Sequence, residues 1–145
     1  MIKKMKVDKS FVPCSVADGD EMYANGIFVF NITKMIECLG ADPDGIALES
    51  VAVSDLWESS SINEPHVDSV DVSKPVIMAE IAPGKYNLID GNHRVAKACK
   101  MGIKSVQAYR FNVQQHMRFL TDSKAYATYV EYWNSKLKDF KSDGS

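Results

Sequence analysis

The sequence has few of the features that mark specialised protein classes. Its three cysteines (Cys14, Cys38 and Cys99) are far apart and form no Cys-x-x-Cys pair, which excludes a zinc ribbon or a thioredoxin-type site. Thiols in this pattern indicate a reducing, cytoplasmic setting. No hydrophobic run approaches the roughly 18 residues that a membrane span needs. The basic first residues are not followed by the apolar region of a secretory signal, so we expect no membrane association.

Common catalytic motifs are also missing. The sequence contains no Walker P-loop, no Gly-x-Ser-x-Gly and no Gly-x-Gly-x-x-Gly. The three histidines (His66, His93 and His116) have neither His-x-His nor His-Glu-x-x-His spacing, so we expect no protein-ligated zinc. A Mg²⁺ ion held by one carboxylate and by substrate phosphates would leave little trace in a sequence, so the sequence does not exclude such a site.

The composition is that of one ordinary globular domain, and we treat residues 1–145 as a single domain. Hydrophobic residues make up 46% of the chain and charged residues 25%. The net charge of −2 hides a strong asymmetry. Thirteen acids but only two lysines lie between Asp18 and Glu80, whereas seven bases and one acid lie between Gly84 and Arg118. Either the two segments neutralise each other, or the basic segment faces an anionic ligand.

Hydrophobic patterning divides residues 27–140 into three parts. Residues 1–26 are expected to be irregular, and residues 27–47 form an extension made of a short buried strand (27–30) and a helix. Asn31 or Thr33 caps this helix, Gly40 ends it, and its apolar face consists of Ile32, Met35, Ile36 and Leu39. Residues 48–111 form the core, with strands expected at 51–53, 76–81, 86–89 and 105–111, and a helix at 95–101 that ends at Gly102.

Residues 112–140 are predicted to form C-terminal helices. Asn112 and Gln115 have the spacing of a capping box, and residues 121–123 can cap the last helix. That helix carries one apolar stripe: Tyr126, Tyr129, Val130, Trp133 and Leu137. Three uses of the stripe are open. It can face the core, dock a second copy or another protein partner, or stack nucleic-acid bases.

The most informative segment is Asp90-Gly91-Asn92-His93-Arg94, a turn between a strand and a helix. Free backbone N–H groups and the helix dipole make such a helix start an anion site. Gly91 would let a ligand approach the backbone, Arg94 can hold a phosphate through two hydrogen bonds, and Lys97 lies one turn further on. His93 can donate to a phosphate or transfer a proton. Asp90 either caps the helix or orients His93 or a metal.

Residues 88–98, followed by Gly102 to Val106, resemble the signature of the ParB/sulfiredoxin superfamily. Two upstream segments, residues 51–56 and 71–77, match the segments that usually precede it, so that the resemblance covers roughly residues 48–111. It implies a compact α/β (α+β) domain with a small mixed sheet. It also implies that the phosphates of a nucleotide such as ATP, ADP or CTP, with or without Mg²⁺, bind at Gly91, Asn92, His93 and Arg94.

Departures from the family pattern reduce the number of family functions that we expect this chain to have. Asn92 stands where sulfiredoxins have their catalytic cysteine, and about 35 residues after the last matched strand are too few for the DNA-binding and dimerisation domains of partition proteins. The motif is closest in form to free-serine kinases, which use a glutamate from the loop after the first strand. Glu58 and Glu64 lie in that loop, so the candidate catalytic set is Asp90, His93, Arg94 and Glu64.

Three functions follow from the sequence. The first is an enzyme that binds a nucleotide at residues 90–94 and transfers or hydrolyses a phosphoryl group. The second is a non-catalytic, nucleotide-responsive adaptor or partition-related protein that docks a partner through its aromatic C-terminal helix. The third is a ParB-like nuclease or other nucleic-acid-processing protein. The acidic total charge argues against the third, because non-specific DNA binding requires many phosphate contacts.

Overall fold

Two small β-sheets and several helices give the chain a mixed α+β fold. In the computed structural model, which describes residues 4–25, 28–56 and 70–144, strands β1 (Met22–Asn25) and β2 (Phe28–Asn31) pair as an antiparallel hairpin. The larger sheet has the order β3-β6-β4-β5, and its strands are Ala47–Ala52 (β3), Val76–Ala82 (β4), Lys85–Asp90 (β5) and Ser105–Phe111 (β6). Strand β4 is parallel to β6, whereas β3 with β6 and β4 with β5 are antiparallel. The expected α+β class and mixed sheet are therefore confirmed.

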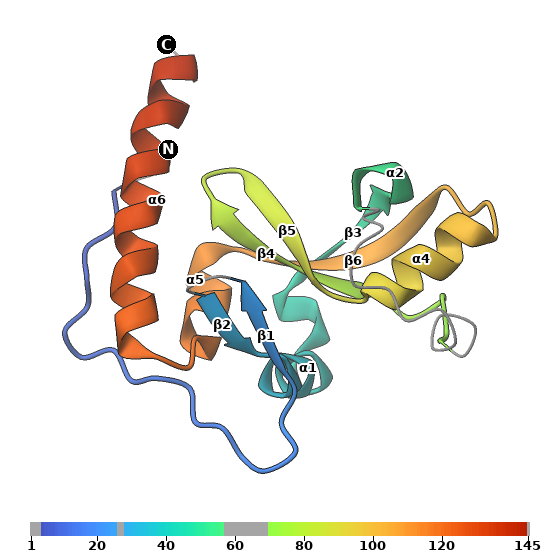
Figure 1. Ribbon diagram of the computed structural model, residues 1–145, viewed down its shortest axis with the longest axis horizontal. Helices are drawn as coiled ribbons and strands as arrows, with labels where there is room; N and C mark the ends of the chain where they lie inside the picture. Colours follow the sequence, from blue (N-terminus) through green and yellow to red (C-terminus); the bar gives the residue numbers. More distant parts are fainter. Residues whose placement is uncertain (1–3, 26–27, 57–69, 145) are drawn as a thin grey trace.

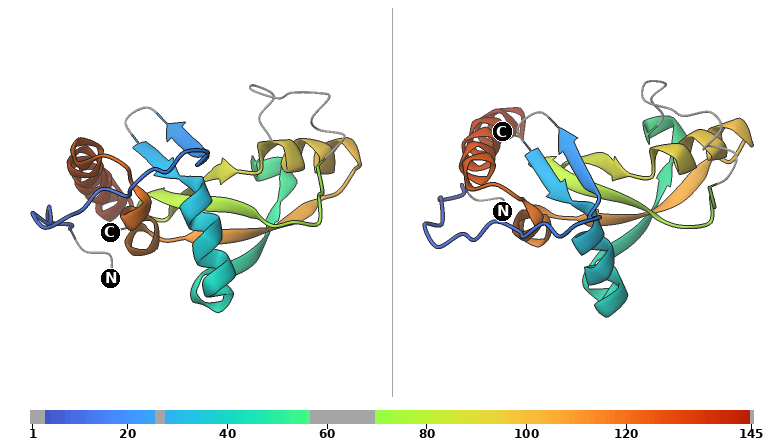
Figure 2. Two further views of the ribbon diagram at one scale, coloured as in Figure 1. Left: turned by 90° about the horizontal axis from the view of Figure 1, so that it is seen from below. Right: turned by 60° about the horizontal axis from the view of Figure 1, so that its bottom comes forward.

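The helices lie on both sides of the larger sheet and at one end of it (Figures 1 and 2). Their bounds are Ile32–Ala41 (α1), Val53–Leu56 (α2), Asn92–Lys100 (α4), Val113–His116 (α5) and Ser123–Gly144 (α6), with 3-10 turns at Pro43–Gly45 (η1) and Met117–Phe119 (η2). Helices α2 and α4 lie together at one end of the molecule, and α6 stands at the opposite end. No helix among the described residues is long and apolar enough to cross a membrane.

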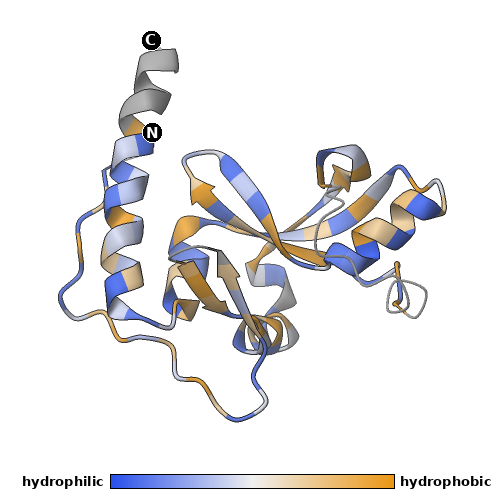
Figure 3. Cartoon of the chain, in the orientation of Figure 1, coloured by the Kyte–Doolittle hydropathy of each residue, from blue (hydrophilic) through white to orange (hydrophobic). Residues whose placement is uncertain are grey.

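Strand β4 divides the interior into two hydrophobic clusters. Every residue of β4 is buried, and successive side chains of a strand point to opposite faces. Val76 and Met78 pack with the side chains of α2 and α4, whereas Ile77, Ala79 and Ile81 pack with the β1–β2 hairpin, α1 and α6. Figure 3 shows mainly hydrophobic residues along β2 and β4. The sequence of β4, hydrophobic except at Glu80, thus reflects burial on both faces.

The apolar stripe of α6 faces the core of its own chain. Tyr129 is fully buried, Trp133 is 3% exposed, and the other three members of the stripe are buried as well. The ring of Tyr129 packs edge-on against Phe28 and against His116. This is the core-facing alternative of the sequence interpretation.

Several local expectations are confirmed in detail. Asn31 caps α1 by accepting a hydrogen bond from the Lys34 N–H, and Asn112 and Gln115 form the reciprocal capping box. The end of α4 is a Schellman motif, in which Gly102 has φ +76° and the Ile103 N–H donates to the Ala98 carbonyl at 2.8 Å. These signals depend on the sequence within one or two turns, which explains why they could be identified without the structure.

Other local expectations were wrong. Residues 22–25 form β1 rather than an irregular arm, so the extension begins before residue 27. Helix α1 continues through Gly40 to Ala41, and Ile36, expected on its apolar face, is 46% exposed. Strand β3 begins at Ala47, and Val53, expected to end it, begins α2 instead. The pairing of β1 with β2 and of β3 with β6 sets the strand bounds, and the apolar pattern of either segment alone does not contain that information.

A buried polar cluster joins α5 and α6 to β4. The backbone carbonyl of Glu80 accepts two hydrogen bonds, one from the ring nitrogen Nε2 of His116 at 2.6 Å and one from the hydroxyl of Tyr129 at 2.5 Å. Desolvation lowers the pKa of His116 to about 4, since burial penalises the charged imidazolium. The folded protein therefore holds His116 neutral at pH 7.

This burial predicts a loss of stability in mild acid. Between about pH 6.5 and pH 4 the unfolded chain binds a proton at His116 that the folded chain does not, so the free energy of unfolding falls as the pH falls. One pKa unit corresponds to about 1.4 kcal/mol, so the contribution approaches about 3 kcal/mol by pH 4. Urea titrations at a series of pH values measure it, and His116→Gln, which keeps a donor for the Glu80 carbonyl, should flatten the slope. An equal slope in the variant would contradict this account.

Candidate functional site

The turn between β5 and α4 is built around Gly91. This glycine has φ +110°, a region that side-chain-bearing residues rarely adopt, and it is the N-cap of α4. A Cβ atom placed on Gly91 would lie 2.5 Å from Cγ1 of Val76, at the start of β4. The sequence interpretation gave this space to a ligand, but the structure gives it to Val76. Gly91 is required for the packing of the turn on the sheet.

Arg94 and Asp90 tie the first turn of α4 to the strands beneath it. The Arg94 guanidinium donates to the backbone carbonyl of Pro75 at 2.6 Å, and its other terminal nitrogen lies 3.4 Å from a carboxylate oxygen of Asp90. Both side chains are largely shielded from solvent, with 22% and 15% of their area exposed. The helix cap lies at Gly91, and the Asp90 carboxylate lies on Arg94 rather than capping the helix. Both residues therefore act as positioning residues for the turn.

The remaining predicted site residues are placed differently. The Lys97 ammonium group donates to the carbonyl of Val70 at 2.8 Å, which joins α4 to the segment that precedes β4. His93 lies half-buried in the first turn of α4. Glu58 and Glu64 lie outside the described residues. The structure thus brings Asp90, Gly91, Asn92, His93 and Arg94 together in one turn, with Lys97 one turn along the helix.

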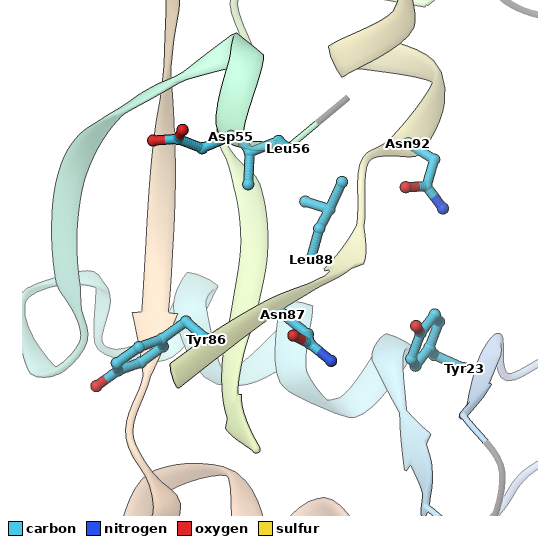
Figure 4. A pocket seen from close by; sticks show the side chains of 7 residues that line it. All are labelled: Tyr23, Asp55, Leu56, Tyr86, Asn87, Leu88 and Asn92. Atoms are coloured by element: carbon cyan, nitrogen blue, oxygen red, sulfur yellow. The ribbon is translucent and has the colours of Figure 1, made fainter. Parts of the chain in front are cut away.

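Asn92, the first residue of α4, opens onto a polar cavity of about 260 Å³. Figure 4 shows that α2, β5, α4 and β1 all contribute to its wall. Asp55 and Tyr86 lie on one side, Asn92 and Tyr23 on the other, and Asn87 and Leu88 lie between them. The cavity therefore places a helix N-terminus beside the amides of Asn92 and Asn87, which can donate hydrogen bonds, whereas the Tyr86 hydroxyl and the Asp55 carboxylate point away from Asn92 (Figure 4).

Most of the cavity lining was missed by the sequence interpretation. Tyr23 comes from β1, which no local pattern identified, and Tyr86 and Asn87 are ordinary residues of a hairpin strand. Only the alternation of β5 side chains and the proximity of α2 bring Asp55 and Tyr86 to the same wall. The β1–β2 hairpin adds no strand to the larger sheet, but through Tyr23 it closes one side of the cavity.

Tyr86 is held in place by charged neighbours. The guanidinium carbon of Arg110 lies 4.0 Å from the centre of the Tyr86 ring, and Arg110 also forms an ion pair with Glu49. Burial, and next the charge of Glu80, raise the pKa of the Tyr86 hydroxyl, which is therefore protonated and able to donate at neutral pH. The pair between Arg110 and Glu49 joins the basic segment to the acidic one, so part of the charge asymmetry is neutralised within the chain.

Metal-binding capacity at this site is limited to isolated carboxylates. Across residues 4–25, 28–56 and 70–144, no three histidine, cysteine, aspartate or glutamate side chains gather in a way that could hold a metal ion. All three cysteines are free thiols. Asp55 is the carboxylate among the residues that line the cavity. One carboxylate is compatible with Mg²⁺, which often takes a few protein ligands and completes its shell with water and phosphate oxygens.

No model of a known protein family matches the chain, and no curated protein is similar to it. The resemblance to the ParB/sulfiredoxin superfamily therefore rests on the motif residues alone.

The packing of Gly91 predicts a difference between two glycines of positive φ that border α4. Gly91→Ala combines backbone strain with a steric clash against Val76, whereas a Cβ on Gly102 meets nothing within 4 Å. We expect losses of about 1 kcal/mol for Gly102→Ala and about 3 kcal/mol for Gly91→Ala in urea unfolding. Equal losses would show that the contact with Val76 does not constrain the turn.

Proposed function

We propose that the chain is a nucleotide-binding domain that holds the phosphates of its ligand in the polar cavity at the N-terminus of α4. The observation that carries the proposal is the position of Asn92. This residue is both the first residue of α4 and part of the cavity wall, so a ligand in the cavity meets the positive end of the helix dipole. The motif resemblance supports the same location for a phosphate.

The size of the cavity supports a role for the phosphate end of the ligand. Sites that enclose a whole small molecule usually measure about 300–1,000 Å³, and this cavity measures about 260 Å³. Its lining offers the Asn92 and Asn87 amides as donors. Phosphate oxygens accept hydrogen bonds from such groups. The sugar and base would then extend beyond the residues that line the cavity.

Asp55 gives the site a place for Mg²⁺. The Asp55 carboxylate lies across the cavity from Asn92 and points away from it (Figure 4), so it would meet the phosphates only where they reach across the cavity. A Mg²⁺ ion bound there by Asp55 and phosphate oxygens would remove the repulsion between the two anions. The metal would neutralise charge on the phosphates. Asn92 and the helix N-terminus would fix the position of the phosphates, and Arg94 and Asp90 would hold the helix in place.

For catalysis, the proposal is phosphoryl transfer or nucleotide hydrolysis at this turn, with His93 as the candidate proton carrier. Arg94 is already bound to Asp90 and to the Pro75 carbonyl, so its role is to position the turn. Loss of activity on changing Arg94 would therefore mix a loss of structure with a loss of chemistry. Asn92 offers the sharper test, because its side chain lines the cavity and forms no hydrogen bond with another of the described residues.

Asn92→Asp is expected to weaken binding of ATP with Mg²⁺ at least tenfold. The substitution places a negative charge beside the phosphates, while an aspartate in the first turn suits the helix dipole and should preserve the thermal unfolding midpoint. Isothermal titration calorimetry measures the affinity. The matched control is Gln107→Glu, an equal change of charge at an exposed position of β6 outside the cavity. Unchanged affinity in Asn92→Asp would refute the location, and phosphate release by the wild type would distinguish an enzyme from a non-catalytic switch.

Asp55→Asn tests the place assigned to Mg²⁺. We expect the wild type to bind ATP more tightly with Mg²⁺ than without it, and the variant to lose most of that difference. Without Mg²⁺ the variant should bind ATP more tightly than the wild type does, because it lacks the repelling carboxylate. Titration of both proteins with and without Mg²⁺ gives the four affinities. An unchanged Mg²⁺ dependence in the variant would place the metal elsewhere.

A further inference from the structure

Strand β3 forms an open edge of the larger sheet. It stands at one end of the order β3-β6-β4-β5, and β6 is its only strand partner in the described part of the chain. Five of its six residues are exposed, and Val51 is partly buried. Both the outer side of the strand and most of its side chains are therefore accessible from solvent.

Every second residue of β3 has backbone groups that point away from the sheet. The Val53 N–H, one residue past the strand, donates to the Lys104 carbonyl at 2.9 Å. In an antiparallel ladder, residues that bond to the neighbouring strand alternate with residues that do not. Because the register between β3 and β6 is regular, the N–H and C=O groups of Leu48, Ser50 and Ala52 point outward. No described residue forms a hydrogen bond with these outward groups.

Strand β3 lacks the devices that usually protect an exposed edge, which are a lysine, a proline or a bulge. Its sequence is Ala-Leu-Glu-Ser-Val-Ala, and its pairing with β6 has no irregularity. The single charged residue, Glu49, forms an ion pair with Arg110 of β6. By contrast, β5 at the other end of the sheet begins with Lys85, and register shifts interrupt its pairing with β4. The edge at β3 is therefore suited to accept a further strand.

We propose that this further strand is β3 of a second copy of the chain, paired antiparallel about a two-fold axis at Ser50. In this register Ser50 lies opposite Ser50 of the second copy, and Leu48 of each chain lies opposite Ala52 of the other. Each residue with outward backbone groups thus meets another such residue, and each pair exchanges two hydrogen bonds. Leu48, which is 47% exposed in the single chain, gains an apolar neighbour. The two four-stranded sheets join into one continuous sheet.

The geometry of the edge favours a second copy over an unrelated extended segment. A single peptide strand on β3 would leave its own outer edge open, whereas two β3 strands each close the edge of the other.

The sequence of β3 also selects one register. An axis at Glu49 or at Val51 would match only two of the three residues with outward groups, and an axis at Glu49 would place two carboxylates directly opposite each other. With the axis at Ser50, Glu49 lies opposite Val51. The dimer does not depend on the proposed nucleotide site, because no residue of β3 lines the polar cavity.

Sedimentation velocity of the full chain over a concentration series tests the proposal with two variants of one residue. We expect a dimer whose fraction rises with concentration and whose dissociation constant increases roughly tenfold in Ser50→Pro. The proline removes an N–H that points outward, so every bond between β3 and β6 is kept. The matched control is Ser50→Ala, which keeps the N–H and should leave the dimer unchanged. A chain that is monomeric at every concentration overturns the proposal, as does a dimer that a folded Ser50→Pro variant still forms equally well.

Cross-linking tests the register without a proline. Paired Cα atoms across the axis would lie about 5.5 Å apart, within the range of a disulfide, so mild oxidation of Ser50→Cys should give a covalent dimer. Leu48→Cys is the matched control on the same face, because its two copies would be four positions apart, roughly 14 Å, which a disulfide cannot span. Electrophoresis without reductant measures both, and the wild type shows the contribution of the native cysteines. Equal cross-linking in the two variants, or none in Ser50→Cys, overturns the proposal.

Discussion

The contact between Gly91 and Val76 fixes the position of the candidate site. It lets the chain turn from β5 into α4 directly above the start of β4, with no room for a side chain at the turn. Arg94 and Lys97 then bind α4 to the carbonyls of Pro75 and Val70, on the segment that leads into β4. These contacts determine where the helix N-terminus lies, and hence where Asn92 meets the cavity. Residues that a motif would assign to a ligand are thus used first to build the surface that the ligand would meet.

The sequence predicted most of the regular structure, because the relevant signals are local. The hairpin of β4 and β5, the limits of β6, the Gly102 helix end and the capping box at Asn112 all depend on residues within a few positions of one another. Strand β1 was missed because it is only four residues long and is held by pairing with β2. The exposure of Ile36 was missed because amphipathic spacing shows which side of a helix is apolar but not how far the core extends.

The candidate site was predictable only in part. The Asp90–Arg94 segment gave the position of the turn correctly, because glycine and charged residues between a strand and a helix are a local signal. It was not predictable which residues of the turn face a ligand and which hold the turn in place. Whether Arg94 faces a ligand or a backbone carbonyl depends on the path of residues 70–75, and the opposite wall of the cavity comes from Tyr23 and Asp55, which are distant in sequence. Long-range packing decides both questions.

The double hydrogen bond at the Glu80 carbonyl has a consequence for how this chain can change in evolution. Strand β4 is fixed near one end by Val76 against Gly91, and near the other by Glu80, whose carbonyl receives His116 and Tyr129. Inserting or deleting one residue between these points would move every following side chain to the opposite face of the sheet. It would also displace the carbonyl that anchors α5 and α6. The number of residues from Val76 to Glu80 should therefore stay constant among divergent copies of this chain, even where the residues themselves are replaced.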